Sequence, residues 1–338
     1  MEMAAIAVVG CHLCSDLAEV TGDLGALDSS GFWAVAIDFH GQAVCARFNS
    51  VRPARPWRGR PWKGLPADTW TSSLNRDGFT TRVSAIREMI AAGDVYQVNL
   101  TRRLSAPLVH PNTDIAALGA ALAEGNPAPY AAVLRLPEHG VHIASASPER
   151  FLVRNGSWVE SSPIKGTAAD PRGLTPKDQA ENLMIVDLVR NDLGRVCEYG
   201  TVSVPALFSL EAHPGLVHLV STVRGKLAPN RGWSELIDAT FPPGSVTGAP
   251  KPAALDVIAA LETQPRGVYC GAVGWVDADR KQGDLNVAIR TLWLEGEHLH
   301  LGTGGGITYD SDPEDEWQET ELKAKRLLAV ATGEHIPL

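Results

Sequence analysis

The sequence predicts an α+β fold, in which layers of β-sheet carry helices. Two observations lead to this class. Apolar runs with strand character outnumber the segments with helical periodicity, and several candidate strands follow one another without an intervening helix. A regular alternation of strands and helices would instead predict a doubly wound parallel sheet. The 338 residues are enough to bury a substantial core, as one large domain or two small ones.

The first 75 residues are interpreted as an N-terminal segment. Short apolar runs separated by turns predict strands over residues 1–50. Residues 51–70 are rich in Pro, Trp and Arg, and the favoured interpretation is an extended connector whose tryptophans pack on the rest of the protein. The alternative is a strip that docks a partner, because Trp and Arg dominate interface hot spots.

The stronger signals begin near residue 76 and define a second part, 76–338. A helix is predicted over 80–92, where Gly93 would end it, and a strand over 94–100 places Gln97 and Asn99 on one face. Further strands are predicted at 141–146, 157–162, 216–223, 270–276, 285–294 and 298–303. Further helices are predicted near 177–193, 233–239, 252–262 and 313–331.

Charge and cysteine content limit the function and the compartment. The net charge of −9 offers no diffuse attraction for nucleic acid or an anionic membrane. Glu2 stands where a secretory signal would carry Lys or Arg, and no apolar run approaches the roughly 20 residues of a membrane span. The odd number of cysteines does not suggest a disulfide framework, and Cys11 and Cys14 are read as packing residues rather than as a redox or metal pair. We therefore expect a cytoplasmic protein.

Acidic residues on two predicted helices are the first candidates for chemistry. Glu181 shares a helical stripe with apolar residues, so it needs a cationic partner or a metal. Asp312 would cap the last helix, on which Glu316, Glu319 and Lys323 line one face. Carboxylates from two helices could share a hard cation such as Mg²⁺, and an internal salt bridge is the alternative.

Two other features gain meaning only in combination. Lys165 follows a predicted strand, in a turn between Pro163 and Gly166, where a surface lysine is the common finding and a desolvated nucleophile the rarer one. The glycine-rich segments 244–251 and 302–306 match neither a phosphate loop nor a dinucleotide fingerprint, although their amides can bind a carboxylate.

Read in order, these segments resemble the chorismate-utilising enzymes, a family that includes anthranilate, aminodeoxychorismate, isochorismate and salicylate synthases. The resemblance covers about residues 76–331. Its motifs lie at 93–100, 147–151, 163–167, 181–195, 218–222, 247–251, 269–271, 288–291, 304–307 and 317–320. It implies a layered β-sheet sandwich with outer helices, the fold of anthranilate synthase component I.

Two positions distinguish the members of this family. Isochorismate and salicylate synthases carry a lysine that activates water at the position matched by Gln97, which argues against water as the nucleophile here. Anthranilate synthases typically read P-I-A-G-T where this chain has P-I-K-G-T over 163–167. The lysine is typical of aminodeoxychorismate synthase component I, so the resemblance implies an amino-transferring enzyme that forms 4-amino-4-deoxychorismate on the way to 4-aminobenzoate, for folate or for a secondary metabolite.

The resemblance also assigns roles to individual residues. Lys165 is expected to attack the ring as an uncharged amine, while Glu149, with a pKa raised by burial, protonates the leaving hydroxyl. His218 is expected near the ring, for orientation. Mg²⁺ is expected on Glu181 and Glu319, with Glu316 nearby. The residues expected to hold the substrate's carboxylates are Arg290, Lys323, Tyr269, Gly166, Thr167 and Gly305.

Two departures from the family pattern complete the expectations. Residues 1–75 are shorter than the N-terminal portion of relatives and lack its L-L-E-S-type motif. No glutaminase sequence is present, so ammonia is expected from solution or from a separate glutamine amidotransferase subunit. The alternatives are anthranilate synthase component I, a non-catalytic docking subunit of the same fold and, third, a phosphate-dependent transferase.

Overall fold

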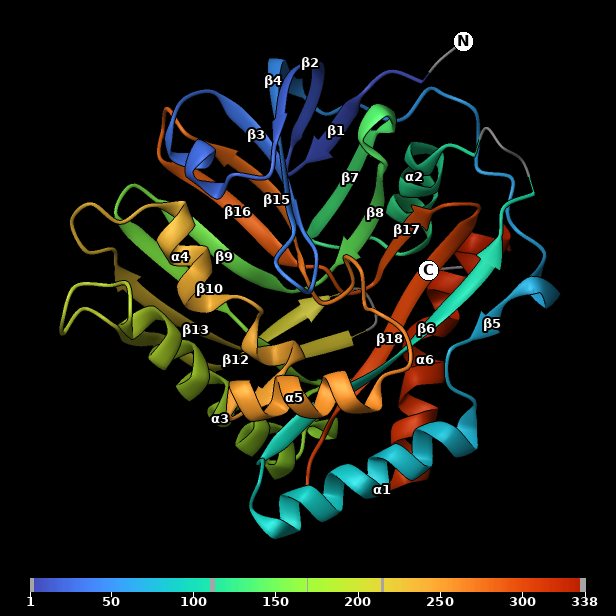
Figure 1. Cartoon of the computed structure of the whole chain (residues 1–338), viewed down its shortest axis with the longest axis vertical. Helices are drawn as coiled ribbons and strands as arrows, with labels where there is room; N and C mark the ends of the chain where they lie inside the picture. Colours follow the sequence, from blue (N-terminus) through green and yellow to red (C-terminus); the bar gives the residue numbers. More distant parts are fainter. Residues whose placement is uncertain (1–2, 110–112, 169, 214–215, 335–338) are drawn as a thin grey trace.

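Antiparallel strand pairing connects the molecule into one large, curled β-sheet in the computed structural model, which describes residues 3–109, 113–168, 170–213 and 216–334. Figure 1 shows the sheet at the centre, with helices around its outside. Fold class and outer helices agree with the sequence-based prediction.

The sheet can be followed from strand to strand. Its first part contains β12 (Ser203–His213), β13 (Leu216–Lys226), β10 (Trp158–Ser162), β9 (Arg150–Asn155), β16 (Gln282–Val287), β15 (Ala272–Asp277) and β3 (Phe32–Ile37). It continues through β4 (Ala43–Pro53), β2 (His12–Thr21), β1 (Ile6–Val9), β7 (Tyr130–Leu136), β8 (Val141–Ser147), β17 (Thr291–Glu295), β18 (His298–Ile307) and β6 (Gln97–Pro107). Strand β11 (Ile164–Ala168) pairs with β13, and the short β5 (Thr71–Ser72) and β14 (Gly248–Ala249) pair with β6.

The helices lie around the sheet, and α1 begins at Arg76, four residues before its predicted start. They are α1 (Arg76–Ala92), α2 (Ile115–Gly125), α3 (Pro176–Gly194), α4 (Trp233–Thr240), α5 (Lys251–Leu261) and α6 (Pro313–Thr332), with 3₁₀ turns at Leu24–Asp28, Ala67–Thr69, Pro137–His139, Pro171–Gly173 and Gly244–Val246. Gly93 ends α1 in the left-handed conformation, with φ of 86°. The Asp312 carboxylate accepts from the amides of Glu314 and Asp315 and so caps α6. No helix in the described part of the chain is long and apolar enough to span a membrane.

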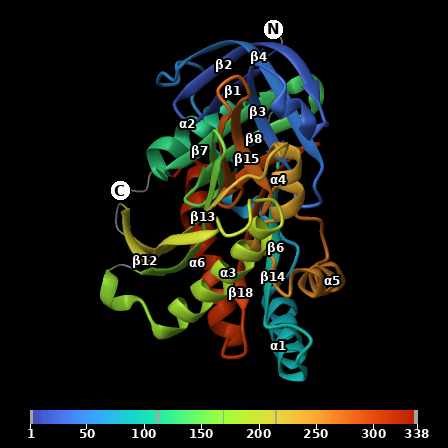
Figure 2. The ribbon, with the colours of Figure 1, turned by 90° about the vertical axis from the view of Figure 1, so that its left-hand side faces the viewer.

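Two apolar cores stabilise this arrangement. The larger lies within the curl of the sheet and includes Trp33, Val98, Leu134 and Leu285. The smaller packs α2 and α6 against the outer face of β6, β8, β17 and β18 through residues such as Leu118 and Leu327. Figure 2 shows β1 to β4 at one end of the molecule. Because β1 pairs with β7 and β3 with β15, these N-terminal strands share the sheet with the rest of the chain.

The predicted strand over 285–294 is wrong as a single element. It is two strands, β16 and β17, separated by a bend at Ala288–Arg290. The bend forms because β16 pairs with β15 and β9, whereas β17 pairs with β8 and β18, so the chain crosses from one region of the sheet to another. The sequence-based prediction also missed one helix and six strands: α2, β5, β7, β9, β11, β12 and β14.

Residues 51–53 belong to β4, and two contacts tie the rest of the segment 51–70 to the end of α6. Trp62 Nε1 and the Leu65 amide both donate to the carbonyl of Ala331, at distances of 2.9 Å. Cys11 is exposed, unlike the other four cysteines, so it does not serve the packing role expected for it. Burial raises the pKa of the Cys14 thiol to about 12, as suits a packing residue.

Candidate active site

Lys165 lies within the strand β11, at an irregular position, and not in the turn that the sequence predicts. The ladder with β13 pairs Ile164 with Val220 and Thr167 with His218, so two residues of β11 oppose one of β13. Such a β-bulge redirects a side chain out of the regular ladder. Gly166 within the bulge has φ of +84°, which favours glycine. Lys165 Nζ donates a hydrogen bond to the carbonyl of Ser245, at 3.2 Å.

Glu149 is the buried carboxyl of this site. It lies in the turn from β8 to β9 and is only 4% exposed. Burial raises the pKa of Glu149, while hydrogen bonds with the Ser245 side chain and the Ile164 backbone, and the charge of Lys165, oppose the rise. The net direction is the one that a general acid needs, because it keeps a proton available at higher pH.

Gln97 and the glycines of β18 lie on another side of Lys165. A Cβ atom added to Gly306 would collide with Nε2 of Gln97 and lie 3.4 Å from Lys165 Nζ. A Cβ at Gly305 would lie 3.0 Å from Glu316 Oε2 and 3.9 Å from Lys323 Nζ. The missing side chains of Gly305 and Gly306 therefore leave the space into which these groups point. Gln97 is 1% exposed, and its Oε1 makes no hydrogen bond within the described residues.

Three glutamates, Glu181 of α3 and Glu316 and Glu319 of α6, lie near lysine side chains. Glu319 forms an ion pair of 2.7 Å with Lys323, which also donates to the Gly304 carbonyl. Glu316 is buried and accepts from the Ser311 hydroxyl at 2.6 Å. Glu181 lies 3.8 Å from Lys177, the salt bridge that is the alternative to a metal.

Their pKa values show that these carboxylates influence one another. Burial raises the pKa of Glu181 and Glu316, and the charge of Glu319 adds to both rises. The pKa of Glu319 is lowered, chiefly by the charge of Lys323, with smaller contributions from Lys165 and Lys177. The three glutamates and Lys165 therefore form one electrostatic cluster.

The donor set of this cluster suits a hard divalent cation. Carboxylate oxygens from two elements, mutually repelling and partly buried, are ligands that Mg²⁺ prefers. Within the described residues, however, no three acidic, His or Cys side chains are close enough together to hold a metal ion as they stand. Glu319 would have to exchange its contact with Lys323 for the metal.

The remaining predicted residues fall into two groups. His218 is buried on β13, opposite Thr167 in the ladder, so it lies next to the bulge that carries Lys165. The side chain of Thr167 is outside what the structure describes.

Tyr269 and Arg290 form the second group, and no hydrogen bond links either to Lys165 among the described residues. Tyr269 packs on Gly302 and lines a small pocket with Thr101, Glu262 and Arg266. Arg290 lies in the bend after β16, with φ of +49°, and not on a strand as expected. Burial lowers the pKa of Arg290, and the charge of Arg326 lowers it further. No ion pair of Arg290 with a carboxylate is present among the described residues, so its charge is available to an anionic ligand.

Ser245 is the site residue that sequence reasoning missed. Its carbonyl accepts from Lys165, and its side chain bonds with Glu149, so it joins these two side chains. The pattern of the glycine-rich segment 244–251 predicts backbone amides that can bind a carboxylate, but nothing in it indicates which strand the segment faces.

The arrangement defines a class of enzyme. It combines a lysine amine, a buried carboxyl with raised pKa and a glutamate cluster suited to a hard cation. Residues 60–329 match the family described as chorismate binding enzyme. The chain therefore belongs to the chorismate binding enzyme family.

Relatives with two activities are similarly distant from the chain. It is 43% identical over 275 residues to anthranilate synthase component 1 of Streptomyces coelicolor, covering 77% of this chain and 52% of the relative. It is 38% identical over 314 residues to aminodeoxychorismate synthase component 1 of Escherichia coli, covering 88% of this chain and 68% of the relative. The chain spans about half the length, or less, of several curated relatives that it matches.

Solved structures show the same fold. Anthranilate synthase component I from Streptococcus pneumoniae superposes with a TM-score of 0.73 at 27% identity, covering 87% of this chain and 76% of that one. A putative 2,3-dihydroxybenzoate-specific isochorismate synthase from Bacillus anthracis gives 0.79 at 24% identity, with 97% and 96% covered. These similarities confirm the predicted fold.

Proposed function

We propose that the chain is component I of an aminodeoxychorismate synthase, which replaces the 4-hydroxyl of chorismate with an amino group. The observation that carries the proposal is the juxtaposition of Lys165 Nζ with Ser245, which also bonds with the buried carboxyl of Glu149. An amine nucleophile and a general acid connected through one residue suit a displacement in which a hydroxyl leaves.

The reaction proceeds in two balanced steps. Lys165 Nζ forms a bond to the ring carbon beside the carboxylate-bearing carbon, the double bond shifts, and the 4-hydroxyl leaves as water with a proton from Glu149. Ammonia then bonds to the 4-position, the double bond shifts back, and the bond to Lys165 breaks. The nitrogen that came from ammonia then loses a proton, which returns to Glu149. Splitting one difficult substitution into two easier ones is the advantage of covalent catalysis.

Ammonia as the nucleophile is supported by Gln97. Its amide is neutral and cannot remove a proton from water, whereas ammonia attacks without a base. Gln97 lies beside Lys165 on the Gly306 side of the site.

Other residues of the chain bind and orient the substrate. Arg290 and Lys323 supply positive charge for its carboxylates, together with Tyr269, the amide of Gly305 and the Gly166-Thr167 segment, and His218 orients the ring. Glu181, Glu319 and Glu316 would hold Mg²⁺, which when bound neutralises carboxylate charge and stabilises the departing hydroxyl. The ammonia is proposed to come from a separate glutamine amidotransferase subunit.

A product assay tests the function directly. The purified chain, incubated with chorismate, ammonium and Mg²⁺, should form 4-amino-4-deoxychorismate, identified by chromatography. Anthranilate synthase activity is the second candidate, because relatives with that name are about as similar to the chain as the aminodeoxychorismate synthases are. It would give the ortho product.

Mass spectrometry tests the covalent step. Without ammonia, chorismate should leave an adduct on Lys165, and Lys165→Ala should lose both the adduct and the para product. Lys325→Ala, which removes an exposed lysine of α6, is the control and should retain both. Normal para product from Lys165→Ala would refute the covalent route.

A further inference from the structure

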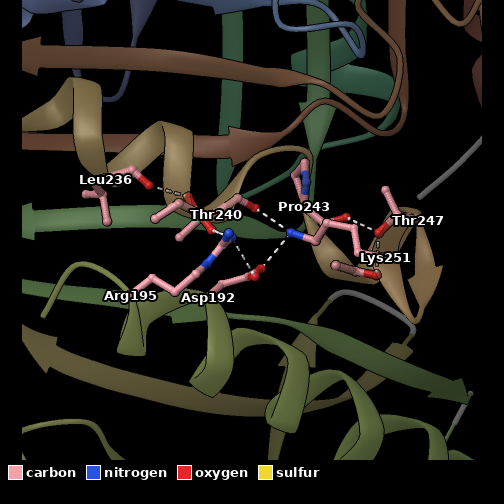
Figure 3. A network of polar contacts seen from close by, with 9 residues as sticks. Asp192, Arg195, Leu236, Thr240, Pro243, Thr247 and Lys251 are labelled. Atoms are coloured by element: carbon pink, nitrogen blue, oxygen red, sulfur yellow. Dashed lines mark hydrogen bonds and ion pairs between the residues drawn. The ribbon is translucent and has the colours of Figure 1, made fainter. Parts of the chain in front are cut away.

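A buried ion pair joins α3 to the start of α5, outside the reactive groups described above. Figure 3 shows Asp192 and Lys251 facing each other, with Arg195 and Thr240 beside them. Lys251 Nζ lies 2.6 Å from Asp192 Oδ2, and the two side chains are 14% and 8% exposed. Arg195 donates to Asp192 Oδ1 at 3.2 Å and to the carbonyl of Ala239.

The pair closes the ends of a loop. Lys251 Nζ also donates to the carbonyl of Thr240, at 3.0 Å, so it ties the residue after the loop 241–250 to the residue before it. Within the loop, the carbonyls of Thr247 and Ala249 accept from the amides of Asn99 and Tyr96 at 2.7 Å. The loop 241–250 is therefore held on one side by α3 and on the other by the segment that enters β6.

This loop supplies Ser245, which contacts both proposed reactive groups. Its carbonyl accepts from Lys165 Nζ, and its side chain bonds with Glu149. Asp192 belongs to α3, the helix that also carries Glu181 of the acidic cluster. The ion pair thus links the helix of the acidic cluster to the loop that touches the nucleophile and the acid.

Energetics argue that stability alone does not explain the pair. Removing two charges from water costs several kcal/mol per ion, and apolar residues of similar size often stabilise a protein as well or better. Burial raises the pKa of Asp192 and lowers that of Lys251, so for each residue desolvation outweighs the attraction of its partner. An ion pair that carries this desolvation cost is suited to holding the surrounding backbone in one conformation.

We propose that Asp192 and Lys251 are positioning residues, which hold the loop 241–250 so that Ser245 keeps Lys165 and Glu149 in register. The inference rests on the proposed function of Lys165 and Glu149. Neither Asp192 nor Lys251 is required to touch the substrate.

The test combines kinetics with a double-mutant cycle. Lys251→Met and the charge-free double variant Asp192→Asn/Lys251→Met should lower kcat by about 10²-fold, the cost of a displacement of about 1 Å in a reacting group. KM for chorismate should change little, because the binding residues lie on other elements. The Lys165 adduct should form more slowly in the same proportion.

Ser245→Ala provides the second half of the cycle. If the pair acts through Ser245, the combination Lys251→Met/Ser245→Ala should lose much less activity than the product of the two single effects. Arg135→Met is the matched control, since Arg135 forms an ion pair of 2.8 Å with Asp114 at α2, and these side chains are 9% and 19% exposed. It should lower the melting temperature and leave kcat unchanged.

The outcomes separate the two proposals. A wild-type chain that makes a different product from chorismate refutes the proposed function, whereas the ratio of variant to wild-type chorismate consumption still tests the positioning role. Unchanged kcat in folded Asp192→Asn/Lys251→Met would overturn the inference and leave the pair a structural contact. Ser245→Ala keeps the carbonyl that contacts Lys165, so full additivity with it would overturn the part of the inference that concerns Glu149.

Discussion

Glu149→Gln should abolish the proposed acid catalysis while preserving the shape of the site. Glutamine has nearly the same size as a protonated glutamate, and its Oε1 can still accept the bonds that Glu149 makes with Ser245 and Ile164. It has no acidic proton to give to the leaving hydroxyl. Loss of a general acid typically costs about 10²- to 10⁴-fold in rate, or about 3 to 5 kcal/mol of transition-state stabilisation.

The same substitution should stabilise the protein at neutral pH. Burial raises the pKa of Glu149 above the value of about 4.3 that the residue has when unfolded. The folded state then binds more protons than the unfolded state, so stability is highest below the unfolded pKa and falls as pH rises through the folded pKa. Each unit between the two pKa values costs about 1.4 kcal/mol at neutral pH, and Glu149→Gln removes that cost.

Two measurements on one variant check this reasoning. Steady-state rates with chorismate and ammonium should fall as estimated, and thermal unfolding should show a melting-temperature advantage of the variant that grows between about pH 4 and pH 7. Glu138→Gln, at an exposed carboxylate before β8, is the control and should change neither. A variant that is inactive but less stable than wild type at pH 7 would show that Glu149 is a paired anion, and retained activity would exclude it as the acid.

Two further predictions concern the metal and the nitrogen source. Glu319→Gln should remove Mg²⁺-dependent turnover and weaken Mg²⁺ binding measured by calorimetry, whereas Asp315→Asn, an exposed acid on the first turn of α6, should not; full activity of Glu319→Gln would refute the assignment. The isolated chain should use ammonium salts, faster as pH rises and free ammonia increases, and should not use glutamine. Efficient glutamine use by the pure chain would contradict the proposed need for a separate amidotransferase.

Residues close together in sequence determined much of the fold and of the candidate chemistry. The caps at Gly93 and Asp312 are local signals, since a left-handed glycine and a short acidic side chain satisfy backbone groups within one turn. The helical stripe that places Glu319 four residues before Lys323 is likewise a matter of spacing, and the ion pair between them follows. The resemblance to the chorismate-utilising family could be read from motif order alone, and the family match confirmed it.

Only the tertiary structure decided which of these local features meet. Ser245 contacts Lys165 although 80 residues separate them, and Asp192 reaches Lys251 across 59. The division of 285–294 into β16 and β17 depends on strands from distant parts of the chain. Periodicity encodes which face of an element is apolar, but the partner of that face is selected by the packing of the whole chain. For this reason the sequence indicated the candidate residues one by one, and only the folded chain showed that the loop 241–250 contacts Lys165 and that Asp192 pairs with Lys251.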